Sequence, residues 1–388
     1  MAFLLTGSPI NLSQLEEILD KRLMLEIPAD ILSGFTTENV TVNPEQATVA
    51  QDYLKVHAVG FGPEIPEEII RLALIIYLQT YINRNKPDIR QATLNRLLAF
   101  YNRDIFPVVL QQGTSASQLT QLILPLMGIG KVKYQGYELN AADILDIFSW
   151  QPLMLHPAEV TTLLQAQTFS LAQLSYNLLQ LNKFIPWTIY LANVFTQIAS
   201  ANPEDVTEKT TLLQNIFELT QNAFEKNQLD NHETNGPESL INNLSSLIKQ
   251  LQSCLGVLAN YTAETYENLI STSEPPATVS FAQALGLNKL LHYQLDQISV
   301  NSAATPDSFI QLQTLNASLV SLIGLTEQIT ALAFWSVSQV GKVFNLAAEN
   351  LTLAAYYHSE LFVSKEMVIT QLEKTITFIR THSPTVQD

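Results

Sequence analysis

Apolar residues recur every three or four positions along most of this chain, a spacing typical of helices that bury one face. Alternation at every second position, which would indicate strands, is rare. The helical spacing is clearest in six stretches, residues 11–23, 65–83, 88–105, 156–181, 238–270 and 308–357. The pattern therefore predicts an all-α protein made of long helices.

Local signals suggest where some elements begin. Ser13 is followed three residues later by Glu16, which is the pattern of a capping box at a helix start. Pro66 precedes two glutamates, and acidic residues in a first turn favour the positive end of the helix dipole. Residues 131–139 (KVKYQGYEL) indicate a short hairpin.

Several predicted helices exceed twenty residues, whereas helices of globular proteins average about 11–12. The run 308–357 carries only Glu327, Lys342 and Glu349 as charged residues, and its other polar positions are mostly Gln, Asn, Thr and Ser. A helix without a charged stripe suits burial on most of its faces. We therefore expect a long-helix bundle that forms a homo-oligomer, either a dimer or a tetramer.

Domain boundaries are weakly marked. Polar segments rich in Pro, Gly and Asn at 201–209, 230–237 and 271–278 are candidate linkers. We predict one helical domain over residues 1–388, with an N-terminal part up to residue 200 and a long-helix part after it.

Composition narrows the class of protein. The 388 residues are 47% apolar and 14% charged, with a formal net charge of -16 and no long basic stripe, which disfavours nucleic acid and acidic lipid as partners. The first residues lack the basic region of a signal peptide. Apolar windows such as 72–82 are shorter than the roughly 18 residues that indicate a membrane span. We expect a soluble, cytoplasmic protein with no membrane partner.

Metal and thiol chemistry have little support in the sequence. Cys254 is the only cysteine, so a disulfide framework and a cysteine-rich metal site are excluded, and its apolar setting favours a buried structural thiol. The six histidines include no pair at the four-residue spacing of a zinc helix. We predict no metal site.

Three stretches read together carry a resemblance to a known family. Residues 53–81 (YLKVHAVGFGPEIPEEIIRLALIIYLQTY), 94–113 (LNRLLAFYNRDIFPVVLQQG) and 124–164 are similar in order and spacing to segments of the histidine/phenylalanine ammonia-lyases. Later in the chain, residues 298–309 are similar to one further family segment. The resemblance implies the all-α, long-helix bundle of that family.

The resemblance also implies a chemistry whose parts are missing here. The family cyclises an Ala-Ser-Gly triad into an electrophilic methylidene-imidazolone group, whereas Ala116 and Ser117 are followed by Gln118. The family's loop with a catalytic tyrosine has no counterpart before residue 53, and its supporting asparagine is replaced by Gln165. We therefore expect no cofactor and no deamination of amino acids.

Three functional hypotheses follow from this comparison. The chain is a family member redirected to another elimination, addition or cyclisation on a small molecule, in specialised metabolism. Alternatively, it is a catalytically inactive pseudoenzyme that serves as a binding or scaffold protein. The third hypothesis is a true ammonia-lyase.

Polar residues near the matched segments are the candidates for a pocket. Buried Tyr and Gln side chains must find partners, so they either cross-link helices or line a polar pocket. Ser115 or Ser117 alternatively caps the helix that follows them. The pocket candidates are His57, Tyr77, Tyr81, Asn83, Arg84, Ser115, Ser117, Gln118, Gln165, Gln167 and Asn301.

Overall fold

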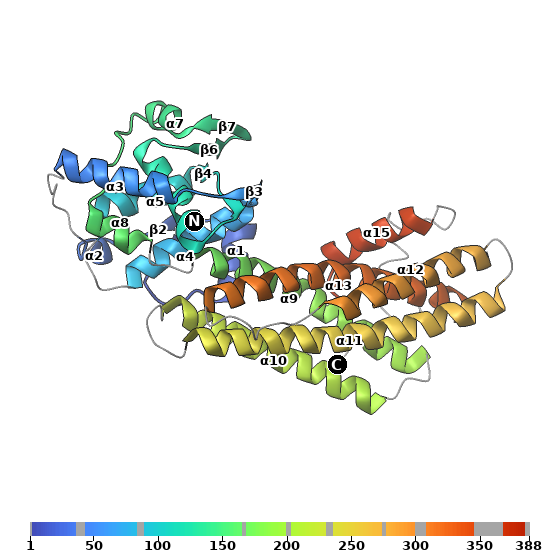
Figure 1. Ribbon diagram of the computed structural model, residues 1–388. Helices are drawn as coiled ribbons and strands as arrows, with labels where there is room; N and C mark the ends of the chain where they lie inside the picture. Colours follow the sequence, from blue (N-terminus) through green and yellow to red (C-terminus); the bar gives the residue numbers. More distant parts are fainter. Residues whose placement is uncertain are drawn as a thin grey trace. The chain divides into compact units, whose positions relative to one another are not determined.

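A computed structural model of the chain describes residues 2–35, 43–83, 89–164, 168–198, 203–229, 236–273, 277–298, 308–344 and 368–384. Contacts between residues divide the chain into two compact units (Figure 1). Unit 1 consists of Met1–Tyr176 and Gln221–Ser239, and unit 2 consists of Asn177–Thr220 and Leu240–Asp388. The prediction of one domain over the whole chain stays a prediction.

Unit 1 combines helices with short strands. Its helices are α1 (Leu12–Asp20), α2 (Ala29–Leu32), α3 (Pro44–His57), α4 (Glu67–Asn83), α5 (Gln91–Asn102), α6 (Ser115–Ile123), η1 (Leu124–Met127), α7 (Ala141–Ile147) and α8 (Pro157–Leu163). Its strands are β1 (Ala2–Leu4), β2 (Met24–Glu26), β3 (Phe61–Glu64), β4 (Phe106–Pro107), β5 (Leu110–Gln112), β6 (Lys131–Tyr134) and β7 (Tyr137–Asn140).

The centre of unit 1 is α4, which is buried at every position from Ile69 to Ile82 except Arg71. Such all-round burial explains why its sequence is a nearly continuous apolar run. Helix α5 packs against α4, and α3 packs against both α6 and α8. These contacts hold the start of α6 and the whole of α8 close to the core of the unit.

The strands form three small sheets. Strands β1 and β2 pair in parallel, and β3 pairs with β5 in antiparallel fashion. Strands β4, β6 and β7 form an antiparallel sheet, in which Tyr134 pairs with Tyr137 across the turn. The predicted hairpin at residues 131–139 is therefore confirmed.

The long helices contribute most of unit 2, and Figure 1 shows them running alongside one another. Three of them, α9, α10 and α11, also extend into unit 1. The helices are α9 (Thr168–Ile198), α10 (Pro203–Leu229), α11 (Gly236–Thr272), α12 (Ala277–Gln297), α13 (Ser308–Phe344) and α15 (Val368–Thr381). The predicted all-α fold class is confirmed, with the short strands as a local addition.

An aromatic cluster holds three of these helices together. The indole of Trp187 on α9 lies edge-on to Phe334 of α13 and to Phe378 of α15. Its Nε1–H donates to the carbonyl oxygens of Ile379 and His382, both at 3.0 Å. A buried indole with a satisfied N–H contributes both apolar area and orientation to the core.

Several predicted boundaries were wrong. Helix α1 is capped by Asn11, whose side chain and that of Gln14 form the capping box, so the predicted pair Ser13 and Glu16 lies inside the helix. The predicted linker 201–209 already belongs to α10 from Pro203 onward. The part of the predicted helix beyond residue 344 lies outside the described residues until Val368.

The expectation that every apolar window is shorter than a membrane span was wrong for α13. Within the 31-residue segment Ile310–Val340 of α13, a window of 18 residues has a mean hydropathy of 1.5, so this helix is long and apolar enough to cross a membrane by length and composition alone. Half of that window is buried within the protein, and the core helix of a bundle passes the same test. The absence of a membrane partner stays a prediction.

Candidate functional site

The segment that resembles the family's prosthetic-group loop forms the first turn of α6. Thr114 has the extended backbone of an N-cap, and its Oγ1 accepts the N–H of Ser117 at 3.2 Å. The Thr114 carbonyl oxygen accepts the backbone N–H of Gln118 at 3.0 Å. The expectation that Ser115 or Ser117 caps this helix was therefore wrong, because the cap lies one residue before Ser115.

The polar side chains of this turn bind the backbone. The Ser117 hydroxyl donates to the Thr114 carbonyl oxygen at 2.9 Å, and Gln118 Nε2 donates to the Gln111 carbonyl oxygen at 3.0 Å. Both side chains are only 5% exposed, whereas Ser115 is half-buried. Gln118 therefore fastens α6 to β5, and Ser117 reinforces the cap.

Two glycines allow the loop to approach the start of α6. A Cβ atom on Gly113 would lie closer than 3.0 Å to the Ser117 hydroxyl, and one on Gly60 would meet Gln121 and Leu110 equally closely. Gln121 accepts the N–H of Leu110 at 2.8 Å through its Oε1. Small residues are thus required here by packing alone.

The methylidene-imidazolone group that the resemblance implies does not match these residues. Ring closure joins the carbonyl carbon of the first triad residue to the backbone nitrogen of the third. The third position here is Gln118, whose N–H is engaged in the first helical turn and whose Cβ restricts the tight backbone turn that glycine permits. We derive no chemical step through that group.

Two tyrosines of α4 hold the last turn of α8. The hydroxyl of Tyr77 donates to the carbonyl oxygen of Leu163 at 2.7 Å. The hydroxyl of Tyr81 lies 2.9 Å from the carbonyl oxygen of Thr162 and 3.1 Å from that of Leu163. The two rings meet edge to face with centroids 4.7 Å apart. These tyrosines satisfy carbonyls that the end of a helix leaves unpaired.

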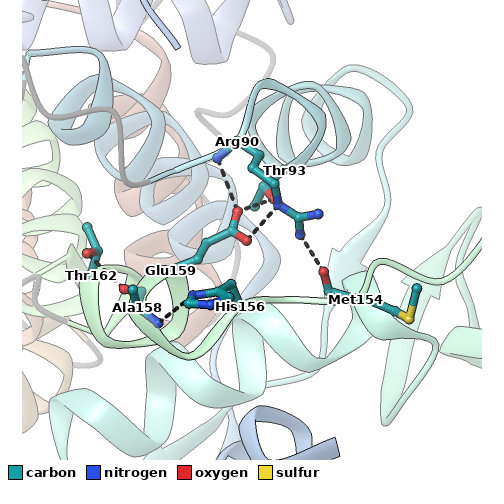
Figure 2. Close-up of polar contacts among 7 residues, drawn as sticks. All are labelled: Arg90, Thr93, Met154, His156, Ala158, Glu159 and Thr162. Atoms are coloured by element: carbon teal, nitrogen blue, oxygen red, sulfur yellow. Dashed lines mark hydrogen bonds and ion pairs between the residues drawn. The ribbon is translucent and has the colours of Figure 1, made fainter. Parts of the chain in front are cut away.

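A buried carboxylate holds the other end of α8 (Figure 2). Glu159 is 1% exposed, and its Oε1 accepts the hydroxyl of Thr93 at 2.6 Å and the backbone N–H of Arg90 at 3.2 Å. Its Oε2 accepts Arg90 Nε at 2.9 Å, and the same guanidinium donates to the Met154 carbonyl oxygen at 2.5 Å. The carboxylate therefore has both a counter-ion and hydrogen bonds, as a buried charge requires.

The sequence indicated none of this network, because its members lie up to 69 residues apart. His156 adds to it as the N-cap of α8, with its Nδ1 accepting the N–H of Ala158 at 3.2 Å (Figure 2). Helix α8 is thus fixed at both ends, shortly before the predicted position Gln165. Gln165 and Gln167, like Arg84 and Asn301, lie outside the described residues.

The remaining candidates lie at helix ends. His57 is the last residue of α3 and is half-buried. Its Nδ1 lies 2.8 Å from the Tyr53 carbonyl oxygen, and the two rings are tilted by 31° with their centroids 4.1 Å apart. Asn83 is the half-buried last residue of α4. The pocket role of all eleven candidates stays a prediction.

Metal chemistry finds no support in the described part of the chain, where no group of three or more His, Cys, Asp and Glu side chains could hold an ion. Cys254 is buried, as the sequence predicts, and its thiol lies 3.5 Å from the Lys209 carbonyl oxygen.

Comparison with known proteins agrees with this architecture. The profile of the family described as aromatic amino acid lyase matches residues 34–225. Histidine ammonia-lyases of Streptococcus gordonii and Streptococcus sanguinis are 29% and 27% identical to this chain over 136 residues. Each match covers 34% of this chain and only 26% of the relative.

Solved structures extend the likeness to nearly the whole chain. A tyrosine aminomutase mutant with a bound ligand has a TM-score of 0.81 at 11% identity, covering 98% of this chain and 97% of its own. Ergothionase from Treponema denticola scores 0.78 at 12% identity, covering 98% and 99%. Histidine ammonia-lyase from Trypanosoma cruzi scores 0.75 at 13% identity, covering 98% and 93%. At these identities the likeness shows the fold.

Proposed function

We propose that this chain, which belongs to the aromatic amino acid lyase family, is a member that lacks the methylidene-imidazolone group. On this proposal the chain releases no ammonia from histidine, phenylalanine or tyrosine. Its function is then the binding or organisation of a partner, as a pseudoenzyme.

One observation carries the proposal, namely the first turn of α6. The residues at the triad position, Ala116 to Gln118, lie in a regular helix that Thr114 caps. The side chains of Ser117 and Gln118 are occupied by the backbone of the same segment and of β5. Without an electrophile, the acceleration of about 10⁶-fold or more that enzymes provide has no source for ammonia elimination.

Tyr77 and Tyr81 support a structural use of the candidate pocket residues. The hydroxyls of Tyr77 and Tyr81 bind carbonyls of α8, as described above. Polar groups that satisfy buried backbone atoms stabilise the fold, and the hydroxyl protons of these two tyrosines are engaged in that way. This favours a binding or scaffold protein over a redirected enzyme.

A redirected addition, elimination or cyclisation on a small molecule is the second candidate, and His57 is the observation that favours it. If Nδ1 of His57 carries the proton, it donates to the Tyr53 carbonyl oxygen, and Nε2 is then a proton acceptor. A half-buried imidazole oriented by a backbone carbonyl is suited to general-base work.

Intact-mass spectrometry tests the proposal directly. The purified chain should have the mass of the unmodified sequence and lack the near-ultraviolet absorption of the group. A deficit of two waters that disappears in Ser117→Ala would refute the proposal. Incubation with the three amino acids should release no urocanate, cinnamate or coumarate, with an active histidine ammonia-lyase as the positive control.

We also propose that the chain forms a homo-oligomer. Helix α12 presents Val279, Leu287, Leu290 and Tyr293 on one side, and each is 39–63% exposed. A contiguous apolar stripe of this kind is typical of an interaction surface. Light scattering that returns a 43.3 kDa species at micromolar concentration would contradict the assembly.

A further inference from the structure

Two arginines and two aromatic rings of unit 1 form a cluster that the family chemistry does not involve. The guanidinium carbon of Arg96 lies 4.6 Å from the ring centroid of Trp150, and that of Arg103 lies 5.3 Å from the same centroid. Arg103 also lies 4.7 Å from the ring of Phe148, which stacks on Trp150 at 4.8 Å and 25°. We call these four residues the arginine–tryptophan cluster.

The cluster brings two like charges together from well-separated backbone positions. Arg96 and Arg103 are seven residues apart, so their Cα atoms are separated by about 10 Å along α5. Phe100 lies between them on the same face of the helix and stacks on Trp150 at 6.1 Å. The two cations therefore converge on one indole from both sides of Phe100.

These charges have little compensation within the described residues. Arg103 is exposed and its guanidinium has no carboxylate or carbonyl partner there. Arg96 donates one hydrogen bond, from Nη2 to the Gln151 carbonyl oxygen at 3.2 Å, while its Nη1 is buried without an acceptor. Burial lowers the pKa of Arg96 from its usual value, as expected for a guanidinium without a counter-ion.

An unpaired pair of arginines is unusual in a chain of net charge -16. Two other arginines of unit 1 have carboxylate partners, since Arg71 pairs with Asp104 and Arg90 pairs with Glu159. Buried donors are normally satisfied, so the unpaired Nη1 of Arg96 requires an explanation, and a bound water or ion nearby is one such explanation. A guanidinium fork matches the geometry of a carboxylate or phosphate group.

The backbone that presents the rings is itself constrained. Ser149 has a φ of 54°, in the left-handed region where glycine is preferred. Its N–H donates to the Asp146 carbonyl oxygen, and that of Trp150 donates to the Leu145 carbonyl oxygen at 2.7 Å. This tight end of α7 places Phe148 and Trp150 so that their rings stack.

We propose that the arginine–tryptophan cluster binds the oxyanion of a small molecule, either a phosphate or a carboxylate group. The anion accepts hydrogen bonds from the free edge of the exposed Arg103 guanidinium, and the neighbouring Arg96 guanidinium contributes a second positive charge. Trp150 forms the wall of the site and holds both guanidinium groups in place through cation–π contacts. The proposal does not depend on whether the chain forms the methylidene-imidazolone group.

Tryptophan fluorescence can measure the binding of an anion to the arginine–tryptophan cluster. Trp150 is half-buried, whereas Trp187 and Trp335 are 0% and 3% exposed. Titration with sodium phosphate, and separately with sodium benzoate, should change the emission saturably at millimolar concentration. Sodium chloride at equal ionic strength should not. A comparison of the two dissociation constants shows which of the two anions the cluster binds more tightly.

Three substitutions test whether the fluorescence change comes from an anion bound at Arg103. Arg103→Met should weaken binding by about tenfold or more, because a charge-assisted pair is lost. Lys289→Met removes an exposed cation of unit 2 and should leave the affinity unchanged. Arg103→Lys keeps the charge but not the fork and should bind with intermediate affinity. Circular dichroism confirms that each variant is folded.

The proposal is overturned if neither anion produces a saturable change, or if chloride produces the same one. It is equally overturned if Arg103→Met binds as tightly as the parent chain. Isothermal titration calorimetry on the parent chain and Arg103→Met gives an independent readout that does not rely on Trp150.

Discussion

Replacement of Glu159 by alanine should be among the most damaging single changes in unit 1. The carboxylate is 1% exposed and accepts three hydrogen bonds, from Thr93, from the backbone of Arg90 and from its guanidinium. Without it, Arg90 has no carboxylate partner among these contacts while its side chain is only 16% exposed. The loss therefore leaves a nearly buried cation and two further donors without their acceptor.

The magnitude follows from the burial of this ion pair. Removing one partner of a buried pair costs about 3–5 kcal/mol of folding free energy, because the remaining charge is stranded. Glu17 and Lys21 form a matched control on α1, with a distance of 2.7 Å and side chains 48% and 62% exposed. An exposed pair of this kind contributes about 0–1 kcal/mol.

Urea unfolding followed by circular dichroism, combined with amide hydrogen exchange, provides the assay. We expect Glu159→Ala to lose stability and to expose the amides of α8 and of the start of α5, whereas Glu17→Ala should remain close to the parent. In a double-mutant cycle, Arg90→Met should restore part of the loss. A loss below about 1 kcal/mol for Glu159→Ala would refute the reasoning, because it would place the pair in the exposed class.

Three further predictions address charge, backbone and assembly. Burial raises the pKa of Tyr266 well above 10.0, so the folded chain keeps this phenol neutral. The contribution of Tyr266 to stability should be complete below pH 10 and should fall above it, because the unfolded chain then ionises. Thermal melts at alkaline pH should therefore show a smaller loss of stability in Tyr266→Phe than in the parent chain. Arg22 has a φ of 47°, so Arg22→Gly should stabilise the chain by about 0.5–1 kcal/mol in urea unfolding. Leu290→Asp should dissociate the oligomer, as measured by light scattering, and change the folding stability by about 0.5 kcal/mol or less. Ala333→Asp places a charge at a position that is 0% exposed and should unfold the chain, as measured by thermal melts.

The helical periodicity of the sequence was a good guide to the elements because it reports burial, which is a property of each helix by itself. The prediction for residues 65–83 agrees with α4, and the one for 238–270 agrees with α11. Helix ends were less predictable. Asn11 and Ser13 are both good capping residues two positions apart, and the sequence does not show which side chain meets a free N–H.

Long-range contacts between side chains could not be predicted from the sequence, and the reason is physical. Tyr77 was correctly identified as a polar side chain on an apolar helix, yet its partner lies 86 residues away. Both a cross-link and a pocket satisfy a buried hydroxyl, so the residue type does not distinguish them. Trp150 likewise has long-range neighbours, because Arg96 and Phe100 belong to α5, a helix that ends 48 residues before Trp150 in the sequence.

The start of α6 shows why a loop can resemble a catalytic segment without its chemistry. A short, small-residue loop that leads into a buried helix needs an N-cap and glycines wherever the backbone packs closely. Thr114 supplies the cap, and Gly113 and Gly60 supply the close approach to Ser117 and Gln121. These requirements belong to the fold and act whether or not a prosthetic group is formed. The resemblance of such a loop is therefore evidence of a common architecture. Evidence of shared chemistry has to come from position 118, because ring closure favours a glycine there, whereas helix formation accepts Gln118.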